Sequence, residues 1–100
     1  MNLQGFIRSI GTPREWKTKE GESRWTYPVV ITIPFIGADG KERCDDILTD
    51  HTCGNPEYMD KLHKAMEEHT RMDFRVGFSL REWEGKQFQN ARLFDLQIML

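Results

Sequence analysis

The sequence has little cysteine, no strong excess of charge of either sign and no long hydrophobic run. Two cysteines among 100 residues are too few for a disulfide scaffold and fit a reducing compartment, so we expect a cytoplasmic protein. The longest uncharged run, Trp25 to Ala38, contains two prolines and is too short and too polar to span a bilayer. No basic segment followed by an apolar one opens the chain, so we expect no secretory signal.

What the chain does contain is typical of one small folded domain over residues 1–100. Hydrophobic residues make up 38% and charged residues 30%, which excludes disordered and fibrous classes. The net charge of −2 is unevenly spread. Residues 1–44 carry seven basic and five acidic side chains, residues 45–70 two and seven, and residues 71–100 five and four. A basic groove can form if the fold turns the acidic segment away from it.

Residue patterns predict five strands and one helix. The strands are expected at residues 2–10, 24–35, 41–48, 72–81 and 86–99, and the helix from about residue 55 to residue 70. Turn formers and charges in residues 11–23 predict a long exposed connection. Asp39-Gly40 and Glu84-Gly85 predict tight turns between neighbouring strands.

Several residues within these strands predict local features of the sheet. Gly5 predicts a bend or bulge in the first strand. Pro28 and Pro34 cannot donate to a sheet ladder, so we expect them at an edge or a bulge. In the last strand, Phe94, Leu96 and Ile98 are predicted to share one register.

The predicted order is β-β-β-α-β-β, with the helix between the third and fourth strands. Five short strands with one helix in that place is the order of an OB-fold, a small and partly open barrel. We therefore predict a mainly β, five-stranded OB-fold-like barrel as a single domain. Another small α+β sandwich with the same element order is the alternative.

The last third of the chain carries a familiar pattern, Ser79-Leu80-Arg81-Glu82-Trp83-Glu84-Gly85-Lys86 followed by Phe88, Asn90, Arg92 and Phe94. It resembles the final hairpin of bacterial single-stranded-DNA-binding OB-folds, and it is most similar to a small bacterial family of OB-like proteins of unknown function. The segment from Gly5 to Pro13 resembles the first strand and following loop of the same group. The resemblance implies single-stranded nucleic-acid binding and self-association.

Candidate nucleic-acid-binding residues gather in two places. Single-strand binding needs cations for the phosphates and aromatic faces on which bases stack. In the first long connection and the strand after it, these residues are Arg14, Trp16, Lys17, Lys19, Arg24 and Trp25. In the last two strands and their turn, they are Arg75, Arg81, Trp83, Lys86, Phe88 and Arg92. The loops in these two places flank the ligand groove of an OB-fold, so we expect them to bind the single-stranded nucleic acid.

Other roles for the aromatic residues remain open. Trp16 and Trp83 either stack bases or lie over the barrel ends as hydrophobic lids. Trp25 and Tyr27 share the register of Val29, which favours the core unless a bulge turns them outward.

No metal site or catalytic group is indicated. His51 and Cys53 form one short pair of soft ligands, but zinc commonly needs a second pair. Asp45 and Asp46 are adjacent on a predicted strand and so point to opposite faces. Because no nucleophile motif or phosphate-binding glycine loop is present either, we expect neither an enzyme nor a bound cofactor.

Two functional hypotheses follow from the sequence. The first is a non-catalytic protein that binds single-stranded DNA, or RNA, with low sequence preference. The second is a protein-interaction module of the same fold, or a homodimer or higher homo-oligomer, which the acidic segment 45–70 would suit.

Overall fold

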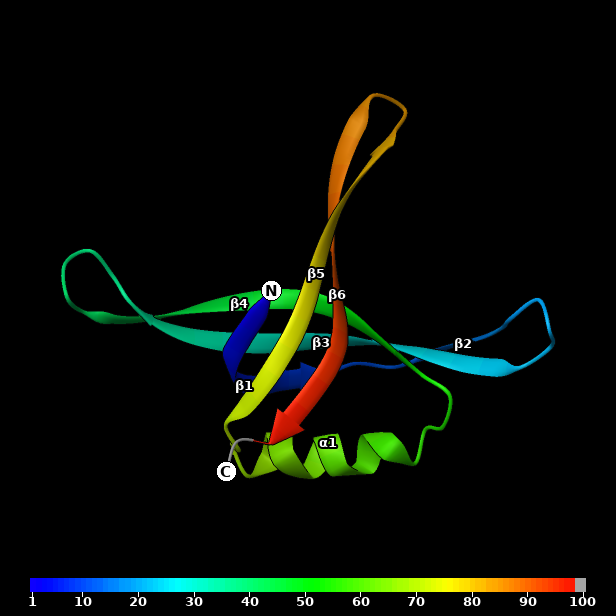
Figure 1. Ribbon diagram of the computed structural model, residues 1–100, viewed down its shortest axis with the longest axis horizontal. Coiled ribbons are helices and arrows are strands. Elements are labelled where there is room, and N and C mark those ends of the chain that lie inside the picture. The colour runs from blue at the N-terminus through cyan, green and yellow to red at the C-terminus, as the bar shows by residue number, and fades with distance from the viewer. Residues whose placement is uncertain (99–100) are drawn as a thin grey trace.

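The computed structural model describes residues 1–98 and contains six strands and one helix (Figure 1). In chain order they are β1 (Asn2–Ile10), β2 (Arg14–Lys17), β3 (Ser23–Ile36), β4 (Glu42–Cys53), α1 (Tyr58–Glu67), β5 (Met72–Trp83) and β6 (Lys86–Ile98). The five long strands and the helix occur in the predicted order, but β4 continues five residues beyond its predicted end at Leu48, and the helix is shorter than predicted at both ends. The expected end of the last strand at Met99 lies outside the described residues. The short strand β2 is an addition, formed within the segment that was predicted to be a connection.

Five of the strands close into a barrel. The strand order is β1-β5-β6-β4-β3-β2, and β1 also pairs with β3, which leaves only β2 outside the ring. The weakest seam joins β4 to β6, which are parallel and share the single pair Asp50 and Arg92. Next to it, the buried side chain of His51 donates from Nδ1 to the Leu93 carbonyl oxygen over 2.8 Å. The predicted mainly β barrel is therefore confirmed.

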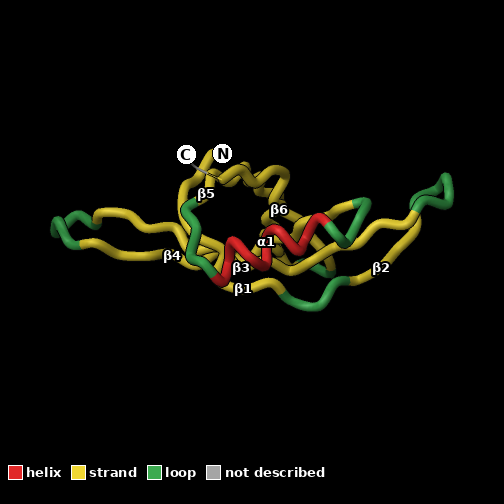
Figure 2. Tube along the Cα trace, turned by 90° about the horizontal axis from the view of Figure 1, so that it is seen from below, coloured by secondary structure: helices red, strands yellow, loops and turns green. Residues whose placement is uncertain are grey.

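The helix lies across one end of the barrel (Figure 2). Its apolar stripe, Met59, Leu62 and Ala65, is buried in the same core as the inner faces of the strands. The Asn55 side chain accepts a hydrogen bond of 3.0 Å from the Glu57 amide, so it caps the turn before the helix rather than α1 itself. The acidic residues of segment 45–70 that belong to the helix are thereby held at one end of the molecule.

The first strand bends at Gly5. Residues 2–5 pair with β5, and from Phe6 onward the strand pairs with β3 instead. A Cβ atom on Gly5 would lie 2.0 Å from the Thr32 carbonyl oxygen, so only glycine fits where the strand turns the barrel corner. The bend that the sequence predicts here is confirmed (Figure 1).

Both strand prolines lie where β3 needs no hydrogen-bond donor. Pro28 falls opposite the gap between β1 and β2, where its carbonyl oxygen accepts from the Gly11 amide over 2.8 Å. Pro34 lies beyond the last β1 pair, on a stretch of β3 that pairs with β4 alone. The expected edge positions are confirmed because each proline faces an interrupted side of the strand.

Three hairpins extend beyond the barrel as arms (Figure 1). We name them the β2–β3 arm (residues 14–26), the β3–β4 arm (residues 33–45) and the β5–β6 arm (residues 77–92). They raise the radius of gyration to 15.1 Å, whereas a compact domain of this length has about 13 Å. Residues 72–80 alternate between apolar and polar side chains, as in a half-buried strand. Met72, Phe74 and Val76 of β5 are buried, but Phe78 and Leu80 are exposed because there the strand has left the barrel.

The predicted register of the last strand is wrong for Phe94, although Leu96 and Ile98 keep a common register opposite Phe74 and Met72. Arg75 pairs with Asp95 and Val76 with Leu93, so Phe94 is an extra residue that forms a β-bulge. Leu93 and Leu96 are buried, whereas Phe94 is 60% exposed. The bulge changes which side of the sheet the following residues point to, and a strict alternation of inward and outward residues does not predict such a change.

Candidate nucleic-acid interface

A groove of about 590 Å³ runs between the β2–β3 arm and the β5–β6 arm. Its floor is the outer face of β3 and β4, and its two walls come from the two arms. Arg14 and Trp16 form one wall, while Arg81, Asn90, Arg92, Leu93 and Phe94 form the other, over the floor residues Thr26, Asp50 and Thr52. We call this hollow the arm groove. Four of the predicted binding residues, Arg14, Trp16, Arg81 and Arg92, come together in it.

Trp16 is held in place through its indole nitrogen. Strand β2 pairs with β3 so that Trp16 lies opposite Arg24, and Nε1 donates to the Thr26 hydroxyl over 2.9 Å. The Thr26 and Thr52 hydroxyls are themselves 2.9 Å apart and hydrogen-bonded. The indole nitrogen is thus satisfied within the protein, while 40% of the residue is exposed to solvent.

One face of the β5–β6 arm combines aromatic and basic side chains. Directly opposed residues of an antiparallel pair lie on the same face, and the face alternates along each strand. The pairs on this face are Gly77 with Arg92, Ser79 with Asn90, Arg81 with Phe88 and Trp83 with Lys86. Phe88 is 51% and Trp83 68% exposed, so neither covers a barrel end as a lid. The face continues the wall of the arm groove to the tip of the arm.

The barrel is similar to two solved structures over nearly its whole length. One is the Plasmodium falciparum SSB in complex with ssDNA, with a TM-score of 0.50 over 99% of this chain and 92% of that one. The other is a small single-stranded DNA-binding protein from Streptomyces coelicolor, with a TM-score of 0.50 over 100% and 93%. The chain has an OB-fold. Sequence identity is 10% in both cases, so the likeness concerns the fold. No protein-family model and no curated protein matches the sequence.

Other predicted residues of this OB-fold lie near the arm groove but outside it. Lys17 follows Trp16 on β2 and so points to the opposite face, where its Nζ lies 3.4 Å from the Ser23 hydroxyl. Lys19 is in the exposed turn at the tip of the β2–β3 arm. Arg24 forms an ion pair of 2.6 Å with Glu22, which partly neutralises its charge. Arg24 lies on the same face as Trp16, next to the groove, whereas Lys17 faces away from it.

Trp25 and Tyr27 belong to the inner face of β3. Tyr27 is buried and Trp25 is half-buried against the core, as their shared register favours. Burial raises the pKa of the Tyr27 phenol above its ordinary value, and the nearby charges of Cys53 and Asp60 add to the effect. Neither ring lines the arm groove, because both side chains point toward the core of the barrel.

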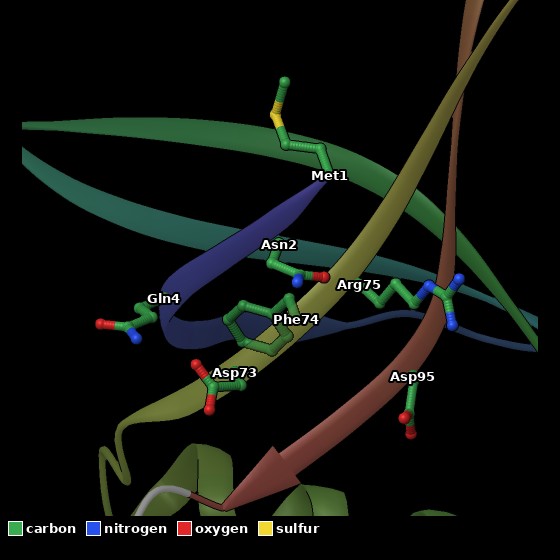
Figure 3. A pocket seen from close by; sticks show the side chains of 7 residues that line it. All are labelled: Met1, Asn2, Gln4, Asp73, Phe74, Arg75 and Asp95. Atoms are coloured by element: carbon green, nitrogen blue, oxygen red, sulfur yellow. The ribbon is translucent and has the colours of Figure 1, made fainter.

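Arg75 lies in a separate depression of about 670 Å³ on the outer face of β1, β5 and β6 (Figure 3). Asp73 and Asp95 line the same depression, so its charge does not suit a phosphate chain. The N-terminal ammonium group of Met1 closes one side by donating to the Val76 carbonyl oxygen over 2.9 Å. The Phe94 bulge lies between this depression and the arm groove, which separates Arg75 from Arg81.

Six residues that line the arm groove are not among the predicted binding residues: Thr26, Asp50, Thr52, Asn90, Leu93 and Phe94. Phe94 is predicted to share the register of Leu96, but the bulge separates the two and Phe94 lines the wall of the arm groove. A signal for it was present: a glycine inside a strand, here Gly77, often marks the close approach of another group. A Cβ atom on Gly77 would lie 2.4 Å from Phe94 Cε2. Asp50 belongs to the acidic segment 45–70, which the sequence analysis treats as turned away from a basic groove.

The charge of the OB-fold is partitioned around the groove. Three arginines and one carboxylate line the arm groove, while the acidic residues of the helix segment are carried at the far end of the barrel. Within residues 1–98, no three His, Cys, Asp or Glu side chains gather as metal ligands. No helix in that range is long and apolar enough to cross a membrane.

Proposed function

We propose that this OB-fold binds single-stranded nucleic acid in the arm groove, with single-stranded DNA as the favoured ligand. The observation that carries the proposal is the placement of three arginines and two exposed aromatic rings, Trp16 and Phe94, on the facing walls of one groove. Arginines neutralise phosphates, and aromatic faces accept any base because every base has a π-face. The protein acts by binding, without catalysis and with low sequence preference along most of the strand.

The similar structures support the same proposal. Both are of single-stranded-DNA-binding proteins, and one of them was solved with ssDNA. The aromatic and basic face of the β5–β6 arm extends the groove, so that Trp83, Lys86 and Phe88 would contact a strand that continues toward the tip. RNA offers the same phosphates and base faces and is a second ligand of the same chemistry.

The test is a titration of the protein with a dT oligomer of about 30 nucleotides, longer than the site of a single OB-fold. We expect quenching of tryptophan fluorescence and an affinity that falls steeply from low to physiological salt, because neutralised phosphates release counterions. A uridine oligomer of the same length compares RNA with DNA. An absence of binding at low salt, where electrostatic attraction is strongest, would contradict the proposal.

A protein-interaction role is the second candidate, and one observation favours it. Phe78 and Leu80, 43% and 66% exposed, lie on the face of the β5–β6 arm opposite to the basic one. Such an apolar strip suits a protein partner or a second copy of the chain better than a phosphate chain. Self-association that is insensitive to salt, with no quenching by oligonucleotides, would support this role instead.

A further inference from the structure

Asp50 is the one carboxylate among the described residues that line the arm groove. It lies on the outer face of β4, exposed, and pairs across the barrel seam with Arg92. The ion pairs found within residues 1–98 do not include it. An anion at this point opposes the phosphate binding that the arginines favour, so it calls for a different explanation.

The floor around Asp50 leaves its carboxylate as a hydrogen-bond acceptor with open capacity. The hydroxyls of Thr26 and Thr52 are bonded to each other, and Thr26 also accepts from the Trp16 indole. An ionised carboxylate has about four acceptor sites and no donor. A group that enters the floor of the groove is therefore favoured if it brings N–H donors, and disfavoured if it brings oxygen atoms.

The walls decide which part of a nucleotide reaches the floor. Arg14, Arg81 and Arg92 line the walls, where they would hold phosphates, and a base stacked on Trp16 or Phe94 would turn its edge toward the floor. Guanine presents two adjacent donors, N1–H and the N2 amino group, which match the two oxygens of a carboxylate. Thymine presents one N–H between two carbonyl oxygens, and both oxygens are repelled by the carboxylate charge.

We propose that Asp50 makes the arm groove selective for guanine at one position of the bound strand. The inference rests on the proposed function, since it assigns a base preference to the same groove. Adenine and cytosine, with a single amino group beside an acceptor nitrogen, are intermediate. Phosphates and thymine are steered away from the floor, which also sets the orientation of the strand: bases inward and backbone along the arginines.

The experiment compares three oligomers of about 15 nucleotides, a length near the upper end of the site size of one OB-fold. The first is all dT, the second carries dG at three separated positions, and the third has deoxyinosine at those positions. Inosine keeps the N1–H donor of guanine but lacks its amino group. We expect the dG oligomer to bind about tenfold more tightly than dT, the order of discrimination of one bidentate base contact, with inosine between them.

Two variants with the same change in net charge separate recognition from general electrostatics. Asp50→Asn should tighten dT binding and reduce the dG preference to less than about twofold, because an amide offers one acceptor in place of the bidentate carboxylate. Asp45→Asn, an exposed carboxylate of β4 on the β3–β4 arm and outside the groove, should keep the wild-type preference.

Three outcomes would overturn the inference. The first is equal binding of dT and dG by the wild type. The second is an unchanged preference in Asp50→Asn, which includes a variant that tightens all three oligomers by the same factor. The third is a loss of the dG preference in Asp45→Asn. In each of them salt-dependent binding of dT leaves the proposed function standing. If none of the oligomers binds at low salt, both the function and the inference are wrong.

Discussion

The ring of Phe94 lies against the backbone of Gly77, so closely that a Cβ atom on Gly77 would come within 2.4 Å of Phe94 Cε2. The bulge on β6 turns Phe94 outward, and the glycine on β5 leaves room for its ring. Two residues that are remote in sequence thus place one aromatic face on the wall of the arm groove.

Replacing Gly77 by alanine should displace this ring without unfolding the protein. Because Phe94 is 60% exposed, its side chain can swing into solvent, and the change in stability should stay below about 1 kcal/mol. Binding of a dT oligomer should weaken by about 1–3 kcal/mol, as expected for one lost stacking face. Phe94→Ala should give the same loss, and Gly54→Ala, where the nearest atom lies at 3.6 Å, should give none. Unaltered binding in Gly77→Ala would exclude Phe94 from the interface.

Trp83 at the tip of the β5–β6 arm offers a test of how far the bound strand extends. Trp83→Ala should weaken binding by about 1–3 kcal/mol because a stacking partner is lost. At 68% exposure it should leave the thermal unfolding temperature unchanged. Phe35→Ala, an exposed ring on the β3–β4 arm, is the matched control and should bind normally. If Trp83→Ala binds with wild-type affinity, the bound nucleic acid does not reach the tip of the arm.

The arginines of the groove should determine the salt dependence of binding. Arg81→Gln and Arg92→Gln should each lower the slope of log K against log salt by about 0.7, the value for one phosphate contact on a single strand. Arg71→Gln, at the helix end of the barrel, makes the same chemical change outside the groove and should keep the slope. Fluorescence titrations at several salt concentrations measure the slope. A slope unchanged in both groove variants would mean that phosphates do not follow this wall.

The barrel corner at Gly5 should tolerate no side chain. Gly5→Ala would place Cβ at 2.0 Å from the Thr32 carbonyl oxygen, a backbone atom that cannot move aside. We expect a loss of about 3 kcal/mol in the free energy of unfolding, the upper range for overpacking. Chemical denaturation of Gly5→Ala and of Gly54→Ala checks this, and equal stability of the two would contradict the close approach.

Alkaline pH should destabilise the fold through Tyr27. Burial raises the pKa of its phenol in the folded state above the ordinary 10.0, so the unfolded chain releases its proton first. The stability contributed by the neutral phenol is complete below pH 10.0 and is lost as the pH rises through the raised folded value. Tyr27→Phe, which has no proton to lose, should show a smaller fall in denaturation midpoint from neutral pH to above 10.0. An identical fall in both proteins would assign the alkaline transition to other groups.

Much of the fold could be predicted because it depends on local patterns. The alternation of apolar and polar residues in 72–76 indicates a strand with one buried face. The spacing of Met59 and Leu62 indicates a helix that packs against the core. The turn at Glu84-Gly85 was equally predictable, since both residues adopt positive φ angles of 51° and 75° there. Among site residues, the cations and rings of the last hairpin could be predicted because their residue types suit a nucleic acid and their hairpin flanks the groove of an OB-fold.

The sequence by itself determined the order of the long strands, the position of the helix, the tight turns, and which segments carry exposed cations and rings. These features depend on side-chain periodicity and on the backbone preferences of glycine, proline and asparagine, which act within a few residues. Only the tertiary structure decided that β2 forms, that Phe94 bulges outward, and that Asp50 and Trp16 share one groove. Those depend on pairings between strands distant in sequence, whose register is set by closure of the whole barrel and not by any single segment.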